Sequence, residues 1–184
     1  MIDHRAHDVL QFWFDPALDA AQRNKRWFSK DAAFDAGIRR RFLALYGEGA
    51  AGRLAAWKDS AREGLALVIV LDQFPRNMFR GAAGAFATDR MAREAARVLL
   101  PRAAELSPEE RLFAWLPFEH SESIDEQNLA CELIAPLGAE LLRYAERHRE
   151  IIERFGRFPH RNAILGRSST PEEVEFLKEP GSGF

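Results

Sequence analysis

The chain contains 184 residues, of which 47% are hydrophobic and 29% are charged, and these proportions are typical of one folded domain rather than of a disordered chain. Its formal net charge of −2 at pH 7 argues against nucleic acid or an anionic membrane as a binding partner. The single cysteine, Cys131, excludes an intramolecular disulfide framework and a cysteine-based zinc cage, and we expect no cofactor.

Helix starts are the clearest structural signal along the chain. A Ser or Thr followed three residues later by Glu predicts a capping box, in which each side chain accepts a backbone N–H group at the start of a helix. Four such pairs occur, at Ser60–Glu63, Ser107–Glu110, Ser123–Glu126 and Thr170–Glu173. Two prolines, Pro108 and Pro171, stand at the first helical position, where a missing N–H group is harmless. Further caps are expected at Asp3, Asp19, Asp31 and Thr88.

Apolar residues at helical spacing predict amphipathic helices over residues 6–13, 34–45 and 141–155. The third apolar face includes Tyr144 and His148, and its helix is expected to end at Gly156, because glycine is favoured just after a last helical turn.

Residues 65–71 are all apolar and rich in β-branched side chains. Because they follow a capping box and no second segment offers a sheet partner, we expect a central buried helix here rather than a strand. The run is far shorter than the roughly 20 residues of a membrane span, and the charged N-terminal segment does not resemble a signal peptide, so a cytoplasmic protein is expected. With roughly eight to ten helices, residues 1–184 are predicted to form a single all-α domain of stacked antiparallel helix pairs.

A Phe-Pro pair followed by Arg and Asn occurs twice, at residues 74–77 and, with one inserted residue, at residues 158–162. We expect each proline to break a helix, because proline lacks an N–H donor and restricts the residue before it. Each copy would then present its Arg and Asn side chains in a turn.

Three longer strings carry a family resemblance: residues 71–81 (LDQFPRNMFRG), 116–122 (LPFEHSE) and 155–162 (FGRFPHRN). They resemble the signatures of a bacterial family catalogued as domain of unknown function 924. Residues 12–14, 26–28 and 165–170 and the closing Gly183–Phe184 also fit, so the resemblance covers practically the whole chain. It implies a tetratricopeptide-like fold of stacked helix pairs, and it implies no activity and no catalytic residue.

Polar side chains at helix ends and in turns form the candidate site. A planar guanidinium group presents a fork of N–H donors, so two arginines with flanking histidine and asparagine side chains suit a phosphate or a carboxylate. We therefore interpret the chain as a module that binds a small anionic ligand or a peptide. The residues expected to bind it are Arg76, Asn77, Arg80, His160, Arg161 and Asn162.

An acid–base enzyme is the alternative hypothesis, most simply a hydrolase or a lyase acting on a small molecule. A histidine beside carboxylates can transfer protons near neutral pH. The candidate catalytic residues are His120, Glu119, His160 and Asp72. His148, by contrast, lies on an apolar helix face and is expected to be a hydrogen-bonded histidine of the core.

Two other kinds of chemistry have weaker support. Ser121 and Ser123 flank His120, but no strand–turn–helix elbow is present to orient a nucleophile. A metal site of His120, Glu122 and His160 would have suitable ligand types without any diagnostic spacing, so we expect no metal.

A purely structural role explains the same residues. Residues 105–132 contain eight acidic residues and one arginine, whereas residues 143–167 contain seven arginines and three glutamates. The two segments are therefore expected to pair with each other, and Asn77 and Asn162 to cap the turn after each proline. On this hypothesis the protein is a structural subunit without a ligand. The sequence does not indicate the oligomeric state.

Overall fold

The computed structural model describes residues 2–183, so Met1 and Phe184, the last residue of the closing Gly183–Phe184 pair, lie outside it. The described residues are all-α and contain no strand. They form two compact units: unit 1 comprises Met1–Arg80 and Gly84–Ala114, and unit 2 comprises Gly81–Ala83 and Trp115–Phe184. A single domain over residues 1–184 stays a prediction.

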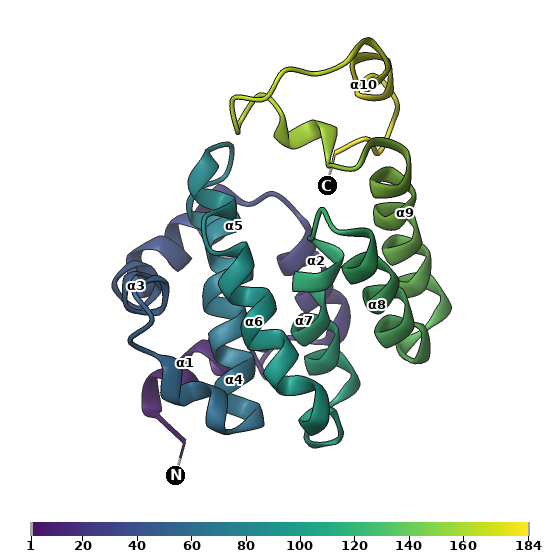
Figure 1. The fold of residues 1–184 in the computed structure, drawn as a ribbon. Helices are drawn as coiled ribbons and strands as arrows, with labels where there is room; N and C mark the ends of the chain where they lie inside the picture. The colour runs from purple at the N-terminus through teal and green to yellow at the C-terminus, as the bar shows by residue number, and fades with distance from the viewer. Residues whose placement is uncertain (1, 184) are drawn as a thin grey trace. The chain divides into compact units, whose positions relative to one another are not determined.

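Unit 1 contains helices α1 to α6, the first part of α7 and the connecting 3₁₀ and π-helical turns (Figure 1). In chain order the elements are α1 (His4–Trp13), α2 (Ala20–Phe28), α3 (Ala32–Ala50), η1 (Ala55–Asp59), α4 (Ala61–Val68), the π-helical η2 (Ile69–Gln73), α5 (Phe74–Met78), η3 (Ala83–Phe86), α6 (Asp89–Leu99), η4 (Leu100–Glu105) and α7 (Pro108–Glu119). Helix α7 begins in unit 1 and ends in unit 2, because the boundary follows Ala114.

Unit 2 contains the end of α7 and the elements α8 (Ile124–Ile134), η5 (Ala135–Leu137), α9 (Ala139–Phe155), η6 (Pro159–Arg161) and α10 (Pro171–Phe176). Helices α8 and α9 pack against each other as a hairpin (Figure 1). As predicted, α9 ends at Gly156, which adopts the left-handed conformation with a φ of 67°.

Most helix starts use the capping residues that the sequence predicts. The side chains of Asp3, Asp19 and Asp31 accept N–H groups in the first turns of α1, α2 and α3. The predicted boxes Ser107–Glu110 and Thr170–Glu173 are complete, with a bond in each direction. These bonds satisfy N–H groups that have no partner inside the helix.

Three predicted caps are only partly right. Ser60 caps α4, but Glu63 accepts the N–H group of Asp3 instead of completing the box. Ser123 precedes α8 without a side-chain cap bond, and the carboxylate of Glu126 accepts the hydroxyl group of Ser121. Thr88 precedes α6 and its hydroxyl group likewise bonds elsewhere.

Aromatic side chains fill the core of unit 1 around Trp13. The buried Trp13 ring lies 5.9 Å from the ring of Phe74 and 5.4 Å from that of Phe113, both also buried. Trp27 of α2 stacks on Trp13 at 6.3 Å and donates its ring N–H group to the carbonyl oxygen of residue 13. These contacts fix α1 and α2 against the first half of α7.

Residues 65–71 form a buried helix, as predicted, but the expected break at Pro75 is wrong. The helix runs through it from Ala61 to Met78, with a π-helical turn at Ile69–Gln73 just before the proline. In this turn the N–H group of Phe74 bonds to the carbonyl oxygen of Ile69, five residues earlier. The wider turn therefore accommodates a residue without an N–H group, and the helix continues.

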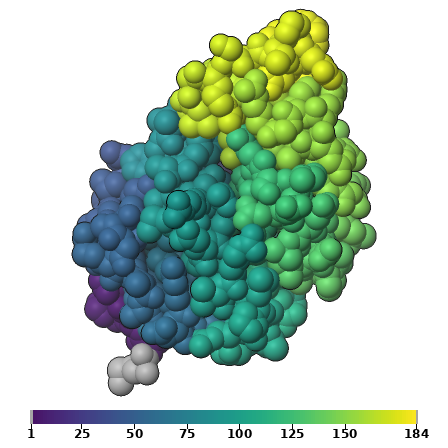
Figure 2. Space-filling model, in the orientation of Figure 1, coloured from purple at the N-terminus to yellow at the C-terminus, as the bar shows by residue number. Residues whose placement is uncertain are grey.

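The core of unit 2 joins α9 to the C-terminal segment. Ile151, Ile152, Phe158 and Phe176 form a buried cluster, and Phe155 packs on it with its ring 5.0 Å from that of Phe176. The space-filling view shows the C-terminal residues covering the end of α9 (Figure 2). The second Phe-Pro copy does follow a helix end, as predicted, and forms η6.

The predicted apolar face of α9 includes one error. Tyr144 is 54% exposed, because the buried face of this helix runs through Ala145, His148 and Ile152 instead. Between residues 2 and 183, no helix combines the length and the apolar content that crossing a membrane requires.

Candidate functional site

The residues predicted to form the site divide between the two units. Unit 1 carries Asp72, Arg76, Asn77 and Arg80, and unit 2 carries Glu119, His120, Glu122, His160, Arg161 and Asn162. Each group forms contacts of its own.

Arg76 is the centre of the group in unit 1. Its guanidinium group donates to both carboxylate oxygens of Asp89, at 2.8 and 3.2 Å, and lies 3.4 Å from the carboxylate of Asp72. The side chain of Gln73 also donates to Asp72, at 2.6 Å. Burial alone lowers the pKa of Arg76, but the two carboxylates raise it above its ordinary value. Arg76 is therefore held as a partly buried cation between two carboxylates.

Asn77 and Arg80 are also held by neighbours. The amide group of Asn77 donates to the carbonyl oxygen of Gln73 and its oxygen accepts a bond from Arg80, so Asn77 does not cap a turn as expected. Arg80 forms a two-pronged pair with Asp35, at 2.8 and 3.0 Å. These contacts suit a network that ties α5 to α3.

Two histidines and Arg161 lie against the buried ring of Phe158 in unit 2, and a third histidine lies against one of them. The ring of Phe158 lies 5.8 Å from that of His148 and 5.6 Å from that of His160. His120 lies 6.5 Å from His148, between ring centres. The guanidinium group of Arg161 lies 4.4 Å over the Phe158 ring. We refer to His120, His148, His160 and Arg161 as the histidine cluster.

His148 is buried, as predicted, and its orientation is fixed. Its Nδ1 atom lies 2.8 Å from the carbonyl oxygen of Tyr144, which can only accept a hydrogen bond. Nδ1 therefore carries the proton, and in the neutral ring Nε2 is the basic nitrogen. The same Nδ1 lies 3.2 Å from a carboxylate oxygen of Glu119, and both side chains are 7% exposed.

Burial and nearby positive charge keep two of these imidazoles neutral. The pKa of His148 falls to about 3, chiefly because burial disfavours the charged ring, with Arg161 and the other two histidines acting in the same direction. Burial and Arg161 also lower the pKa of His160, to about 4. Both rings are therefore neutral at pH 7, where each can offer one N–H donor and one basic nitrogen.

Glu122 and Asn162 belong to a second network in unit 2. Glu122 forms a two-pronged pair with Arg167, at 2.7 and 2.9 Å, and accepts the backbone N–H group of Phe158 at 2.9 Å. Burial raises the pKa of Glu122, but these bonds lower it below its ordinary value. Asn162 accepts a bond from Arg167 and donates to Glu173, so it does not cap the turn after Pro159.

The predicted pairing of acidic and basic segments is thus found at Glu122 and Arg167, but it is not general. Glu109 and Glu110 of the acidic segment pair with Arg23 and Arg62 inside unit 1.

The geometry of the described residues supports neither a nucleophilic Ser121 nor a metal site. The hydroxyl group of Ser121 donates to Glu126 and accepts the N–H group of Ser123. Within residues 2–183, no three His, Cys, Asp or Glu side chains are placed so that they could hold a metal ion.

Sequence reasoning missed the role of two residues at this site. His148 was assigned to the core alone, and its partner Glu119 lies 29 positions away, so no local spacing could connect them. Arg167 was not singled out, although its guanidinium group joins Glu122 to Asn162.

Comparison with known proteins gives the family. The sequence model of a family described as bacterial protein of unknown function (DUF924) matches residues 9–181. The solved structure of the protein of unknown function ATU0120 from Agrobacterium tumefaciens is 45% identical, with 95% of this chain and 97% of that chain covered and a TM-score of 0.88. No curated protein matches the chain. The chain belongs to the DUF924 family, as its three motifs indicated.

Proposed function

We propose that this member of the DUF924 family binds a small anionic molecule at the histidine cluster of unit 2. The observation that carries the proposal is the placement of two imidazoles and one guanidinium group against Phe158, with a third imidazole beside His148. Arg161 supplies a permanent positive charge, and the neutral imidazole of His160 can supply an N–H donor for a phosphate or carboxylate oxygen. A peptide that presents a carboxylate belongs to the same chemical class.

The proposed site contains only two of the six ligand-binding residues that the sequence predicted. Arg76, Asn77, Arg80 and Asn162 are each hydrogen-bonded to other side chains or to the backbone, so we assign them to structural networks. Of the predicted ligand-binding residues, His160 and Arg161 belong to the histidine cluster, in which they lie near His148 and Phe158.

The proposal also includes a tetratricopeptide-like stacking of the helices and a cytoplasmic location. We expect helix hairpins such as α8 and α9 to stack in the tetratricopeptide-like manner, which commonly serves binding, although this is an analogy of fold. We expect the protein to act in the cytoplasm, without nucleic acid or membrane as a partner, and its net charge of −2 supports this.

The test is a thermal-shift screen with inorganic phosphate, phosphate esters, di- and tricarboxylates and short peptides. A ligand at about 100 times its Kd adds about 2.7 kcal/mol of stability, which for this chain length is a rise of roughly 5–11 °C in Tm. We expect a hit with wild-type protein that Arg161→Met and His160→Gln lose. The matched controls are Arg143→Met, an exposed arginine on α9, and His7→Gln on α1; both keep the response. A ligand that still raises the Tm of Arg161→Met would show that the anion binds at another place in the protein.

A second candidate function is a hydrolase or lyase that uses the same cluster. The contact between Glu119 and His148 favours it, because a carboxylate at Nδ1 orients the ring and leaves Nε2 to exchange a proton with a substrate. His120 and His160 are the other candidate acid–base groups of this unit, and Asp72 of unit 1 has its own partners in Gln73 and Arg76.

Measuring whether a bound anion is turned over distinguishes an anion-binding protein from a hydrolase or lyase. Each anion that binds is incubated with the protein and followed by NMR for bond cleavage or elimination. If the cluster is catalytic, Glu119→Gln loses turnover while the anion still binds, because Glu119 only orients His148. If no anion binds and no turnover occurs, the structural-subunit hypothesis replaces both.

A further inference from the structure

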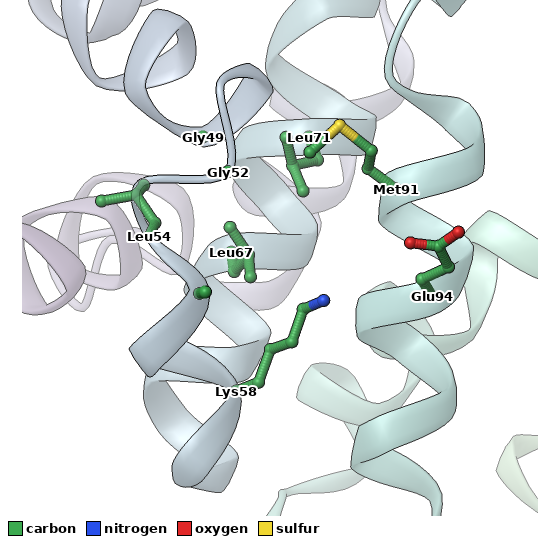
Figure 3. A pocket seen from close by; sticks show the side chains of 9 residues that line it. Gly49, Gly52, Leu54, Lys58, Leu67, Leu71, Met91 and Glu94 are labelled. Atoms are coloured by element: carbon green, nitrogen blue, oxygen red, sulfur yellow. The ribbon is translucent and has the colours of Figure 1, made fainter.

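Unit 1 contains a pocket that is lined by none of the candidate site residues (Figure 3). It lies between the end of α3, η1, the continuous α4–η2 helix and α6. The volume of its interior is about 50 Å³, well below the roughly 300–1,000 Å³ of typical small-molecule sites, so only a short group can enter it. A ligand of this pocket is therefore small.

The floor of the pocket is apolar. Leu54, Leu67 and Leu71 are buried, and Gly49 and Gly52 place no side chain above them. A Cβ atom at Gly49 would lie 3.3 Å from a methyl group of Leu71, so a larger residue there would press on the floor. Gly52 has a φ of +75°, a conformation that favours glycine. The floor is suited to a short aliphatic group.

Two side chains of opposite charge, Lys58 and Glu94, lie at the rim of this pocket. Lys58 reaches in from η1 and Glu94 from α6, on opposite sides of the pocket (Figure 3). Among residues 2–183, Lys58 takes part in no ion pair, and the ion pair of Glu94 is with Arg90, at 2.9 Å on the exposed surface. The ammonium group of Lys58 is therefore available to a ligand, whereas a ligand that pairs with Glu94 shares its carboxylate with Arg90.

A buried hydrogen bond ties the segment before α6 to the floor of the pocket. The hydroxyl group of Thr88, just before α6, donates to the carbonyl oxygen of Leu71 in the π-helical turn. Met91 and Glu94 follow three and six residues later on α6, so this bond sets their distance from the floor. A π-helical turn inside an α-helix often marks a functional site, which agrees with a ligand here.

We infer that this pocket binds a small aliphatic zwitterion of the α-amino-acid class. Its carboxylate pairs with Lys58, its ammonium group pairs with Glu94, and its side chain rests on the floor formed by Leu67 and Leu71. A fatty acid or an alkylamine would use one of the two charges and leave the other without a partner, so both should bind more weakly than the zwitterion.

The experiment is an NMR and calorimetric titration of wild-type protein with L-leucine and L-methionine, and with isocaproate and isoamylamine as singly charged analogues of leucine. We expect saturable binding of the amino acids and about tenfold weaker binding of each analogue. Lys58→Met and Glu94→Gln each weaken L-leucine binding about tenfold. Lys25→Met and Glu105→Gln, at exposed positions of unit 1 outside the pocket, leave it unchanged.

Two further variants keep the result unambiguous. Ala55→Leu fills the mouth from an exposed position of η1, so the fold tolerates it while L-leucine binding is lost. Arg161→Met of unit 2 retains L-leucine binding, which separates this site from the anion site proposed above. The inference is overturned if neither amino acid binds, if isocaproate binds as tightly as L-leucine, or if Arg161→Met alone abolishes binding.

Discussion

The hydroxyl group of Thr88 donates a 2.6 Å hydrogen bond to the carbonyl oxygen of Leu71. In an α-helix this carbonyl would accept the N–H group of the residue four positions later, but that residue is Pro75, which has no N–H group. The next two carbonyls of this turn accept side-chain bonds as well, from Arg76 to residue 72 and from Asn77 to residue 73. The hydroxyl group of Thr88 therefore replaces the one backbone donor that the proline removes, and the side chains of Arg76 and Asn77 add bonds to the next two carbonyls.

Thr88→Val should lower the free energy of unfolding by about 1–2 kcal/mol, because it leaves a buried carbonyl group without this donor. The shape of the side chain is kept, so lost packing contributes little. Thr88→Ser keeps the hydroxyl group and should recover most of the loss. Urea denaturation of the three proteins measures the effect, and equal stability of Thr88→Val and wild type would show that the bond is unimportant.

The Pro75 region also shows where sequence reasoning fails. Proline predicts a break because it lacks a donor, yet the donor that compensates, Thr88, lies 13 positions later in the chain. Helix starts such as Asp19 and Thr170 were predicted correctly because their capping partners lie three residues away. Local chemistry was therefore predictable, and pairing between distant elements was not.

The candidate site shows the same contrast between local features, which the sequence predicts, and contacts between distant residues, which it does not. The sequence indicated which polar residues lie at helix ends, but it could not assign partners to them. Arg76 and Arg161 looked equivalent in the two Phe-Pro copies, yet Arg76 is paired with Asp89, whereas Arg161 stacks on Phe158 among histidines. Only the fold separates a structural arginine from a candidate for binding.

Arg76→Met should be strongly destabilising, by about 3 kcal/mol, because it removes the cation that two largely buried carboxylates share. Arg80→Met is the matched control four residues later. Its pair with Asp35 is 40% exposed on the arginine side, so the loss should stay below about 1 kcal/mol. Chemical denaturation at pH 7 compares them. Similar losses in both variants would contradict the structural role assigned to Arg76.

The histidine cluster should make stability depend on pH in a defined window. Folded His148 and His160 have pKa values of about 3 and 4, whereas the unfolded value is 6.5. Between these limits the unfolded chain binds more protons, so the free energy of unfolding falls as the pH is lowered from about 6.5 towards 4. Above 6.5 both states are neutral and the effect disappears.

His148→Gln should therefore flatten this dependence by about 1 kcal/mol per pH unit between pH 6 and 4.5. His7→Gln, an exposed histidine on α1, should leave the slope unchanged. The slope is obtained from urea denaturation at several pH values, which separates titration from any constant loss of packing. An unchanged slope in His148→Gln would mean that His148 is protonated in the folded protein as readily as in the unfolded chain.

Glu122→Gln tests whether the bonds around the second Phe-Pro copy stabilise unit 2. The carboxylate of Glu122 accepts two bonds from Arg167 and one from the backbone of Phe158, and its side chain is 27% exposed, so its loss should lower stability by about 1–2 kcal/mol. Glu175→Gln removes an ion pair with Lys178 of which both sides are more than 60% exposed, and it should change stability by less than about 0.5 kcal/mol. Denaturation of the two variants at low and high salt checks the comparison, since salt screens exposed pairs more than partly buried ones. If Glu122→Gln were as harmless as Glu175→Gln, the loop from Phe158 to Arg167 would have to be held by its contacts with Glu173 instead.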